Sequence, residues 1–430
     1  MADYHIWGGK PLSGEIRISG AKNGALPLLF GSVLASGPCT FYRMPDIGDI
    51  RLGEEILASM GARILRHDPH TVTVDPAGFS PEAPPGLLTG KMRASSYLMG
   101  ACLGRFGFAP APAIGGCDFG DRPLNCHYGV FHALGASGDA DLHAPPGGLR
   151  GGEYTYPQVS VGATVNGLLA AVCASGVTRL HGCAIESHVG ELIRFLRCLG
   201  ADIRGAGTPD LTIYGGKPLG HTSFVISPDE IEAGTYLLAG VATGGDVTVT
   251  EISPDFLTPL LNVLVRGGCL VERGQDRVRV ARGEHFHGVV VETAPAPGFP
   301  TDLHPPLAAA LCFGEGRSEI RERVWRHRFR YTRELGKMGA HLICREDTLS
   351  ILPAEMHAGI VTATDLRGGA ALVIAGLAAP GRTVLSEREL LERGYEDLPG
   401  KLRALGGEIE ALPPPPPRFS PPPEESAEES

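Results

Sequence analysis

The segment RFLRCLGADI, residues 194–203, contains the pattern that decides the fold of this chain. An amphipathic run is followed by a glycine, a small residue and then an extended stretch. A glycine in this place ends a helix in a left-handed turn, because glycine adopts that conformation without steric cost. The segment therefore predicts a helix, a tight turn at Gly200 and a strand that follows immediately.

The same phrase occurs six times, at a spacing of roughly 65 to 75 residues, which is longer than in the common solenoid repeats. Each unit is therefore predicted to be a small α/β layer. Alternating β-branched stretches between the phrases, at 70–76, 177–182 and 246–252, are predicted strands. The six copies are ILASMGARI (56–64), VFHALGASG (130–138), RFLRCLGADI (194–203), VLVRGGCLV (263–271), LGKMGAHLI (335–343) and LRALGGEIE (402–410).

Six units without a proline- or serine-rich linker predict two domains of three units each. The boundary is expected near ISPDEIEAGT, residues 226–235. In a pair of domains, ligands usually bind in the cleft between them. The alternative is one large α/β domain in which helix-ending glycines recur by chance, and six matches at similar spacing argue against it.

Composition excludes several classes of protein. The 430 residues carry a formal net charge of -10, which argues against a nucleic-acid binder. The start, MADYHIWGGKPLSG, has no basic and apolar signal region. The longest apolar stretch, 159–177, is interrupted by Ser160, Thr164 and Asn166, so it predicts a buried helix and not a membrane span.

The cysteine pattern predicts the location of the protein in the cell, and the composition of the last residues predicts a disordered tail. The ten cysteines are scattered without a C-x-x-C pair, so neither zinc nor a disulfide framework is expected, and a cytoplasmic location is predicted. Residues 413–430 are rich in proline and glutamate and are predicted to be disordered. The alternative for this tail is that its proline run binds a partner.

Basic residues in polar, small-residue contexts are candidates for anion binding. They are Lys22 in SGAKNGALP, Arg122 in GDRP, Arg367 in TATDLRGGA, and Arg328 within RERVWRHRFRYTR (321–333). Guanidinium groups suit phosphate and carboxylate because two parallel N–H bonds match two oxygens. Since no P-loop motif occurs, side chains must hold any bound phosphate. The alternative for each residue is a solvated surface charge.

Two segments place reactive side chains in unusual contexts. Cys117 lies in AIGGCDFGDRP (113–123), a glycine-rich and charged stretch, whereas free cysteines are usually buried. This is either a surface loop that happens to hold a cysteine or a loop that closes over chemistry. Asp302, in APGFPTDLHPP (296–306), lies between prolines and is either a cap or a general base. His188 and Glu191 have an i, i+3 spacing, but without further ligands nearby no metal is predicted.

A set of longer motifs resembles the UDP-N-acetylglucosamine enolpyruvyl transferase family. The motifs are SGAKNGALPLL, MRAS, GGC-x-x-G-x-RP, VSVGAT, FPTD, ATDLR, RGYE and KLRALG, in the order seen in that family, from about residue 8 to residue 411. The related shikimate-pathway enolpyruvyl synthase shares the fold but lacks the cysteine loop.

The resemblance implies an α/β fold of two similar domains, each of three βαβαββ units, known as an inside-out α/β barrel. Residues 22–229 would form the domain that carries the cysteine loop. Residues 1–21 and 230–412 would form the second domain, and residues 413–430 the tail. The active site would lie in the cleft between the domains.

The resemblance also implies a reaction without a cofactor. An enolpyruvyl group moves from phosphoenolpyruvate to a hydroxyl of a uridine nucleotide, and phosphate leaves. Cys117 resembles the proton donor and covalent partner, on a loop that closes over the substrate. Asp302 resembles the carboxylate that receives the proton of the acceptor hydroxyl.

Matching the motifs residue by residue implies two binding sites. The phosphoenolpyruvate site would contain Lys22, Asn23, Arg122, Arg328 and Arg367. The uridine-nucleotide site would contain Arg93, Arg122, Pro123, Leu124, Asn125, Cys126, Gln158, Val159, Ser160, Val161 and Val324.

Three positions depart from the family pattern. Asp397 stands where the family has an arginine that reaches phosphoenolpyruvate, a change of two charge units that opposes binding of a trianion. Arg393 or Arg388 are the candidates to compensate. Gln158 replaces a lysine near the nucleotide phosphates, and His188 replaces a second acid.

These departures leave three functions open. The first is transfer to UDP-N-acetylglucosamine in peptidoglycan synthesis. The second is transfer to the ribose 3-hydroxyl of UMP, as in nucleoside-antibiotic pathways. The third is a catalytically silent homologue that binds a nucleotide. The oligomeric state is left open as well.

Overall fold

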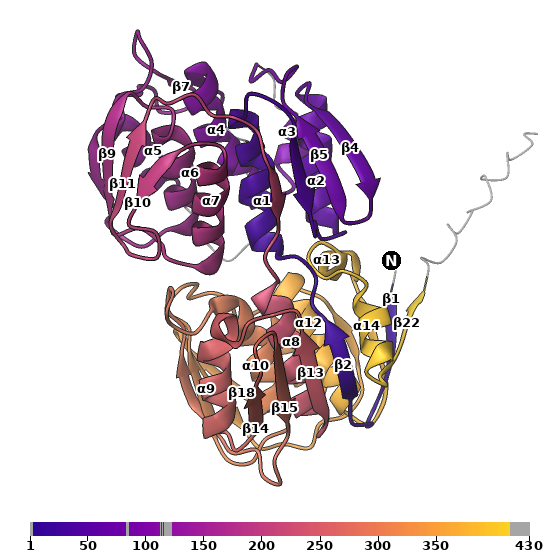
Figure 1. The fold of residues 1–430 in the computed structure, drawn as a ribbon. Helices are drawn as coiled ribbons and strands as arrows, with labels where there is room; N and C mark the ends of the chain where they lie inside the picture. The colour runs from indigo at the N-terminus through magenta and orange to yellow at the C-terminus, as the bar shows by residue number, and fades with distance from the viewer. Residues whose placement is uncertain (1–2, 83–85, 112, 114, 116–122, 413–430) are drawn as a thin grey trace, which may run out of the picture.

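The computed structural model describes residues 3–82, 86–111, 113, 115 and 123–412, which form two lobes (Figure 1). Two connections join the lobes and pair with each other. The Ala21 amide donates to the Ser227 carbonyl at 2.7 Å, and the Asp229 amide donates to the Ser19 carbonyl at 3.0 Å. The chain therefore enters and leaves the first lobe at the same place.

The second lobe contains three four-stranded sheets of one design. In each sheet an edge strand runs parallel to its neighbour, and the remaining pairs are antiparallel. The strand orders are β14-β15-β13-β2, β16-β17-β19-β18 and β20-β21-β1-β22. The strands are β1 (Asp3–Gly8), β2 (Ser13–Arg17), β13 (Asp246–Thr250), β14 (Leu270–Arg273), β15 (Arg277–Ala281), β16 (Val290–Glu292), β17 (Ser318–Arg321), β18 (His341–Arg345), β19 (Thr348–Leu352), β20 (Ile360–Thr362), β21 (Gly381–Ser386) and β22 (Glu408–Leu412).

Three buried helices lie inside these sheets: α8 (Glu230–Ala242), α10 (His304–Leu311) and α12 (Leu366–Ala378). All eight residues of α10 are buried, as expected of a helix that is apolar on every side. Asp229 and Asp365 cap α8 and α12 by accepting backbone N–H groups of the first turn. The other helices of this lobe are α9 (Thr258–Arg266), α11 (Tyr331–Gly336), α13 (Glu389–Glu392) and α14 (Leu398–Ala404).

The first lobe has two sheets of the same design, β12-β3-β5-β4 and β10-β11-β9-β8, and the two-stranded sheet β6-β7. Its strands are β3 (Cys39–Tyr42), β4 (Arg63–Asp68), β5 (Thr71–Asp75), β6 (Phe108–Ala109), β7 (Leu142–His143), β8 (Glu153–Thr155), β9 (Gly176–His181), β10 (Asp202–Arg204), β11 (Leu211–Gly215) and β12 (Ser223–Val225). Its helices are α1 (Lys22–Gly31), α2 (Gly48–Ser59), α3 (Gly86–Thr89), α4 (Tyr97–Phe106), α5 (Asn125–Ala133), α6 (Val161–Ala171) and α7 (Ser187–Cys198).

All six repeated phrases end a helix at a glycine in the left-handed region. The φ angles of Gly61, Gly135, Gly200, Gly268, Gly339 and Gly406 lie between 88° and 106°. The predicted strand follows directly in five copies, as β4, β10, β14, β18 and β22. After Gly135 the prediction of a strand is wrong. Gly138, with φ 106°, bends the chain again, so Ser137 makes only an isolated bridge to His143.

The strands predicted at 70–76, 177–182 and 246–252 are confirmed as β5, β9 and β13. The predicted buried helix at 159–177 is shorter, because α6 ends at Ala171 and β9 begins at Gly176.

Two separate apolar clusters form the cores. One spans residues 25–226, and the other combines residues 4–18 with 231–409. Within the described ranges, no helix has the length and apolar character needed to cross a membrane.

Candidate active site

Asp302 lies between two arginines that come from distant parts of the second lobe. It belongs to the 3₁₀ turn η4 (Thr301–Leu303), directly before the buried helix α10. Arg328, on the loop after β17, places Nη1 2.8 Å from Asp302 Oδ1. Arg367, in the first turn of α12, places both Nε and Nη2 3.2 Å from Asp302 Oδ2. The structure thus brings together three residues that the sequence analysis assigned to the site.

The environment keeps these three groups charged. Burial alone would raise the pKa of the Asp302 carboxyl, but the guanidinium groups of Arg328 and Arg367 lower it well below its usual range. Both arginine side chains are buried, whereas that of Asp302 is 28% exposed. Two cations around one accessible carboxylate leave one net positive charge, which suits an anionic ligand.

Lys22 is the first residue of α1 and extends toward the second lobe. Its Nζ lies 2.7 Å from Asp49 Oδ2, and Asp49 also pairs with Arg393 of the second lobe, Nε to Oδ1 at 2.8 Å. The two cations offset the effect of burial and lower the pKa of Asp49. A Cβ on Gly394 would lie 3.2 Å from Lys22 Cδ, so the second lobe approaches the lysine closely. Asn23 follows on α1 and is half-buried.

Asp49 and Arg393 form a link between the lobes that sequence reasoning did not assign. Arg393 was expected only as a candidate to compensate for Asp397, and Asp49 was not assigned a role. The one local signal for Asp49 was its place in the first turn of a helix, where carboxylates are common for reasons of helix stability alone.

Asp397 has a local role in the structure. It is the N-cap of α14, with φ 42°, and its carboxylate accepts the Gly400 amide at 3.1 Å. The side chain is exposed. Of the two arginines named as possible compensation, Arg393 pairs with Asp49 and Arg388 pairs with Glu392 at 3.3 Å.

The residues assigned to the nucleotide gather at two helix starts in the first lobe. Pro123, Leu124, Asn125 and Cys126 lead into α5, while Gln158, Val159, Ser160 and Val161 lead into α6. Pro123, Asn125, Gln158 and Val159 are exposed. Ser160 caps α6 by accepting the Ala163 amide at 3.3 Å.

The two segments approach each other at two points, and the charge of Arg93 acts on His127 of α5. The Gln158 side chain lies near the Cys126 thiol and acts against the rise in its pKa that burial causes. A Cβ on Gly162 would lie 3.1 Å from the ring of His127, so α5 and α6 touch at their first turns. Arg93 opens the 3₁₀ turn η2 (Arg93–Ser96). Burial and the charge of Arg93 lower the pKa of His127 to about 4, which makes this histidine neutral near pH 7.

Of the remaining residues assigned to the site, the structure describes Val324 but not Cys117 or Arg122. Val324 lies in the second lobe, where its amide donates to Glu322 Oε1 at 2.9 Å. Cys117 and Arg122 lie outside the described residues, as does the tail 413–430.

Of His188 and Glu191, considered above as metal ligands, Glu191 supports the connection between the lobes. Glu191 accepts the Ser227 amide at 2.6 Å. In the part of the chain that the structure describes, no three His, Cys, Asp or Glu side chains come together as potential metal ligands.

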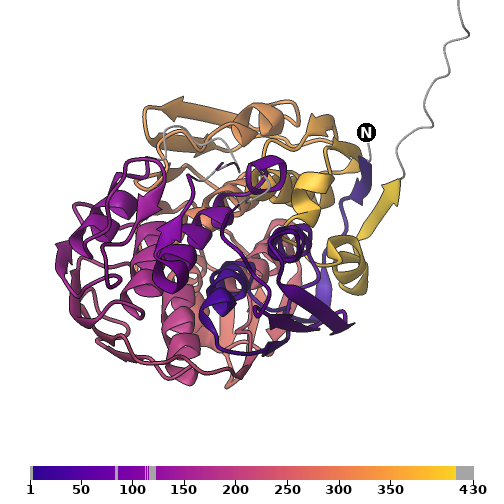
Figure 2. The same ribbon diagram turned by 90° about the horizontal axis from the view of Figure 1, so that it is seen from above.

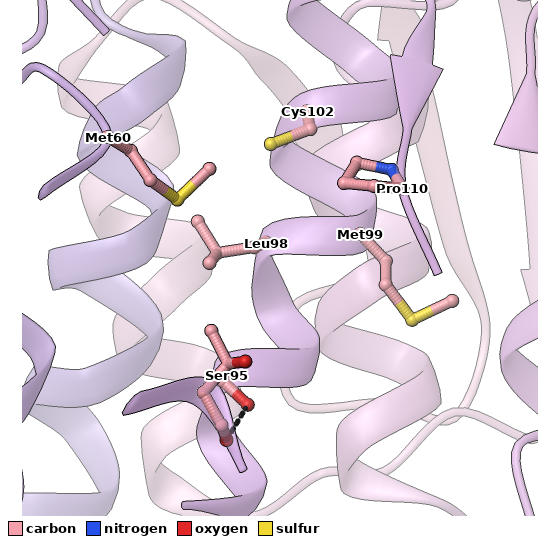
Figure 3. A pocket seen from close by; sticks show the side chains of 7 residues that line it. Met60, Ser95, Leu98, Met99, Cys102 and Pro110 are labelled. Carbon is pink, nitrogen blue, oxygen red and sulfur yellow. Dashed lines mark hydrogen bonds between the residues drawn. The ribbon is translucent and has the colours of Figure 1, made fainter. Parts of the chain in front are cut away.

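The cavity drawn in Figure 3 lies in the first lobe, and Ser95 in its wall belongs to the same 3₁₀ turn as Arg93. Its volume of about 20 Å³ is that of a single small molecule such as water. Burial raises the pKa of the Cys102 thiol in its wall to about 12, which makes this cysteine a poor nucleophile. It is lined by Met60, Thr89, Ser95, Leu98, Met99, Cys102 and Pro110.

Comparison with known proteins identifies relatives along nearly the whole chain. The model of the family EPSP synthase (3-phosphoshikimate 1-carboxyvinyltransferase) matches residues 6–402. UDP-N-acetylglucosamine 1-carboxyvinyltransferase 3 of Caldanaerobacter subterraneus subsp. tengcongensis is 43% identical over 413 residues, which cover 95% of this chain and 99% of the relative. UDP-N-acetylglucosamine 1-carboxyvinyltransferase of Clostridium botulinum is 40% identical over 418 residues, which cover 96% and 100%.

Solved structures agree with these relatives. The enolpyruvyl transferase NikO from Streptomyces tendae superimposes with a TM-score of 0.84 at 30% identity, over 96% of this chain and 99% of that one. EPSP synthase from Acinetobacter baumannii shares the mixed α/β fold, with a TM-score of 0.67 at 18% identity over 95% and 100%. The chain therefore belongs to the EPSP synthase family of enolpyruvyl (carboxyvinyl) transferases.

Proposed function

We propose that this enzyme transfers the enolpyruvyl group of phosphoenolpyruvate to the 3-hydroxyl of UDP-N-acetylglucosamine and releases phosphate, a step of peptidoglycan synthesis. The observation that carries the proposal is the cluster of Asp302, Arg328 and Arg367, a carboxylate held between two buried guanidinium groups. The names of the 43% and 40% identical relatives support this acceptor.

The proposed chemistry is an addition followed by an elimination. Cys117 gives a proton to C3 of phosphoenolpyruvate, the acceptor hydroxyl attacks C2, and Asp302 receives the proton of that hydroxyl. The C2–O bond to phosphate then breaks, and C3 gives one proton back to the Cys117 thiolate, which restores the double bond of the transferred enolpyruvyl group. The phosphate and carboxylate of phosphoenolpyruvate are held by the charges of Lys22, Arg122, Arg328 and Arg367, and Asn23 adds an uncharged hydrogen-bond donor.

The nucleotide is proposed to bind the helix starts of the first lobe together with Val324. Helix N-termini favour phosphate, because their free N–H groups and the helix dipole both attract anions. We assign one domain to residues 22–229 and the second to residues 1–21 and 230–412, with the site in the cleft between them. The two separate apolar cores support this division. The cytoplasmic location stays a prediction from the sequence.

A second acceptor, UMP, is favoured by Gln158. This exposed residue stands where the resemblance leads us to expect a lysine near the nucleotide phosphates, so the site offers one cation fewer to a diphosphate. Transfer to the ribose 3-hydroxyl of UMP is therefore the second candidate. A silent homologue that binds nucleotide without turnover is the third.

One assay separates the three candidates. Phosphate release from phosphoenolpyruvate is measured with UDP-N-acetylglucosamine and, separately, with UMP. We expect turnover with UDP-N-acetylglucosamine. Turnover with UMP alone would replace the proposed acceptor, and no release with either nucleotide would support the silent homologue.

A further inference from the structure

Glu322, which directly follows β17, is a fully buried carboxylate with an unusually complete set of partners. Its side chain is 0% exposed and accepts five hydrogen bonds, each between 2.8 and 2.9 Å. A buried charge is tolerated only when it is paired or fully hydrogen-bonded. The donors are Thr293 Oγ1, Val324 N and Trp325 N to Oε1, and Thr301 Oγ1 and His304 Nδ1 to Oε2.

These bonds join the segments that carry the candidate site. Thr301 and His304 flank Asp302, and Val324 begins the loop that continues to Arg328. Thr301 connects Glu322 directly to Arg328. Its hydroxyl donates to Glu322 Oε2 at 2.9 Å, and it accepts Nη1 of Arg328 at 3.2 Å. The same Nη1 donates to Asp302 at 2.8 Å.

The protonation state of Glu322 determines which group donates and which accepts in the hydrogen bonds from Glu322 through Thr301 to Arg328. Burial alone would raise the pKa of the carboxyl, but the His304 ring and the other donors lower it, so Glu322 is ionised and can only accept. Burial lowers the pKa of His304, which is therefore neutral. The single hydroxyl proton of Thr301 is committed to Glu322, so its lone pair faces the arginine.

We propose that Glu322 and Thr301 are positioning residues for the transfer reaction: the buried carboxylate orients the Thr301 hydroxyl, and that hydroxyl fixes Arg328 against Asp302. The inference rests on the proposed function, because it assigns a purpose to the geometry of that site. It adds two residues that contact neither the reacting hydroxyl nor the phosphate in this scheme.

The substitution Glu322→Gln reverses this direction while it keeps the shape of the side chain. If the amide oxygen keeps the three donors at Oε1, its NH₂ group faces Thr301 and His304. The Thr301 hydroxyl must then accept from the amide, and its proton points at the Arg328 guanidinium, which is itself a donor. We therefore expect Glu322→Gln to remove the hydrogen bond between Thr301 and Arg328, and so to loosen the position of the Arg328 guanidinium, even where the variant folds.

The sharper test compares two threonines that both donate to Glu322. Thr301 bonds Arg328 as well, whereas the other partners of the Thr293 hydroxyl are backbone groups, the Arg323 amide at 2.9 Å and the Arg321 carbonyl at 3.5 Å. Thr301→Val should lower kcat/KM for phosphoenolpyruvate about tenfold, in phosphate release with UDP-N-acetylglucosamine, because a hydrogen bond to a charged group is lost. Thr301→Ser keeps the hydroxyl and should restore at least half of the activity.

Thr293→Val is the matched control. It should lower the melting temperature at least as much as Thr301→Val and leave kcat/KM within about twofold of wild type. Equal losses of kcat/KM in the two valine variants, or an unchanged kcat/KM in Thr301→Val, would overturn the inference. If Thr301→Val does not fold, the smaller Thr301→Ala takes its place. Failure of the proposed function itself is distinguishable, because wild type would then release no phosphate.

Discussion

The two halves of the candidate site are built in different ways. In the second lobe, Arg328 and Arg367 are buried and hold Asp302 through short ion pairs. In the first lobe, Gln158, Val159, Pro123 and Asn125 are exposed at the starts of two helices. One half presents charges whose positions are already fixed, and the other presents an open surface without charged side chains at Pro123, Asn125, Gln158 and Val159.

This difference separates two tasks. Fixed charges need little reorganisation when a reaction develops charge, so the second lobe suits the chemical step. An open surface at helix starts suits binding of a phosphate-containing ligand, with selectivity set by few side chains. Substitutions should therefore change turnover mainly in the second lobe and acceptor affinity mainly in the first.

Cys117 is the expected exception to this division, because its sequence position falls within the proposed domain of residues 22–229 but it is assigned a role in the chemistry. Cys117→Ser should lower turnover by about 10² to 10⁴, the usual loss when a proton-transfer group is removed. Fosfomycin, an epoxide, should alkylate Cys117 in wild type. By contrast, burial raises the pKa of Cys183 and Cys312 to about 12.

Mass spectrometry of the adduct and phosphate release check this assignment. Cys117→Asp is the control, since a carboxylic acid also donates a proton but escapes alkylation, and it should keep part of the activity. An adduct on another cysteine, or full activity in Cys117→Ser, would remove Cys117 from the chemistry.

Asp302→Asn tests the second lobe, and we expect about a hundredfold loss of kcat because the amide accepts no proton. The same change frees two guanidinium groups, so KM for phosphoenolpyruvate should fall. Steady-state kinetics at saturating nucleotide measure both parameters. A loss of less than tenfold in kcat would reassign Asp302 to structure.

Substitution of Glu230 tests the contact between the two lobes, in which Glu230 at the start of α8 meets Ser187 at the start of α7. Glu230 accepts the Ser187 hydroxyl at 2.6 Å, and burial together with Asp229 raises its pKa to about 7. A raised folded-state pKa contributes stability that is present below about pH 4.5 and is lost as pH rises through 7. Glu230→Gln should therefore reduce the fall in unfolding free energy between pH 5 and pH 8 by about 2 kcal/mol.

Urea titrations at the two pH values measure this change. Burial likewise raises the pKa of Glu232 to about 7, and the pairing of Glu232 with Lys401 remains intact in the variant, so part of the pH dependence should persist. An identical pH dependence in wild type and Glu230→Gln would contradict the assignment.

Substitutions of Asp397 test whether residue 397 belongs to the phosphoenolpyruvate site of the second lobe. As the N-cap of α14 it should tolerate asparagine, whereas Asp397→Ala should cost about 1 kcal/mol of stability. Both variants should leave KM for phosphoenolpyruvate within about threefold, since the side chain is exposed. A tenfold lower KM in Asp397→Arg would instead place residue 397 within the phosphoenolpyruvate site, as the family pattern has it.

Gln158→Lys tests the open half and carries the smallest expected effect. A lysine on this exposed surface should lower KM for UDP-N-acetylglucosamine about two- to fivefold, as expected of an exposed charge pair. The gain should shrink in high salt, and UMP, with one phosphate, should gain less. Equal KM values in wild type and variant would place the phosphates elsewhere.

The repeat was predictable from sequence because its cause is local. A glycine at a helix end has one physical reason, and all six glycines adopt the expected conformation. The missing strand after Gly135 was not predictable, since it depends on a second bend at Gly138. Local patterns therefore identified the units, but not which unit would be shortened.

The site was predictable only where motifs carried it. Asp302, Arg328 and Arg367 lie in motifs and do come together. Asp49 and Glu322 were missed, because their importance lies in partners from other segments. Nothing in RERVW distinguishes a fully buried carboxylate from a surface charge until Thr293, Thr301 and His304 surround it.

The pairing of β1 has a consequence for the order in which the protein is made. β1 lies between β21 and β22, so Tyr4 pairs with Leu385 and Ala411, and Asp3 pairs with Leu412 at the end of β22 (Figures 1 and 2). β1 is therefore synthesised long before β21 and β22 and has neither neighbour until they follow. The core of residues 25–226, in contrast, needs no segment that is synthesised after Ile226. A nascent chain can thus complete this core while β1 and β2 still have no partner strands.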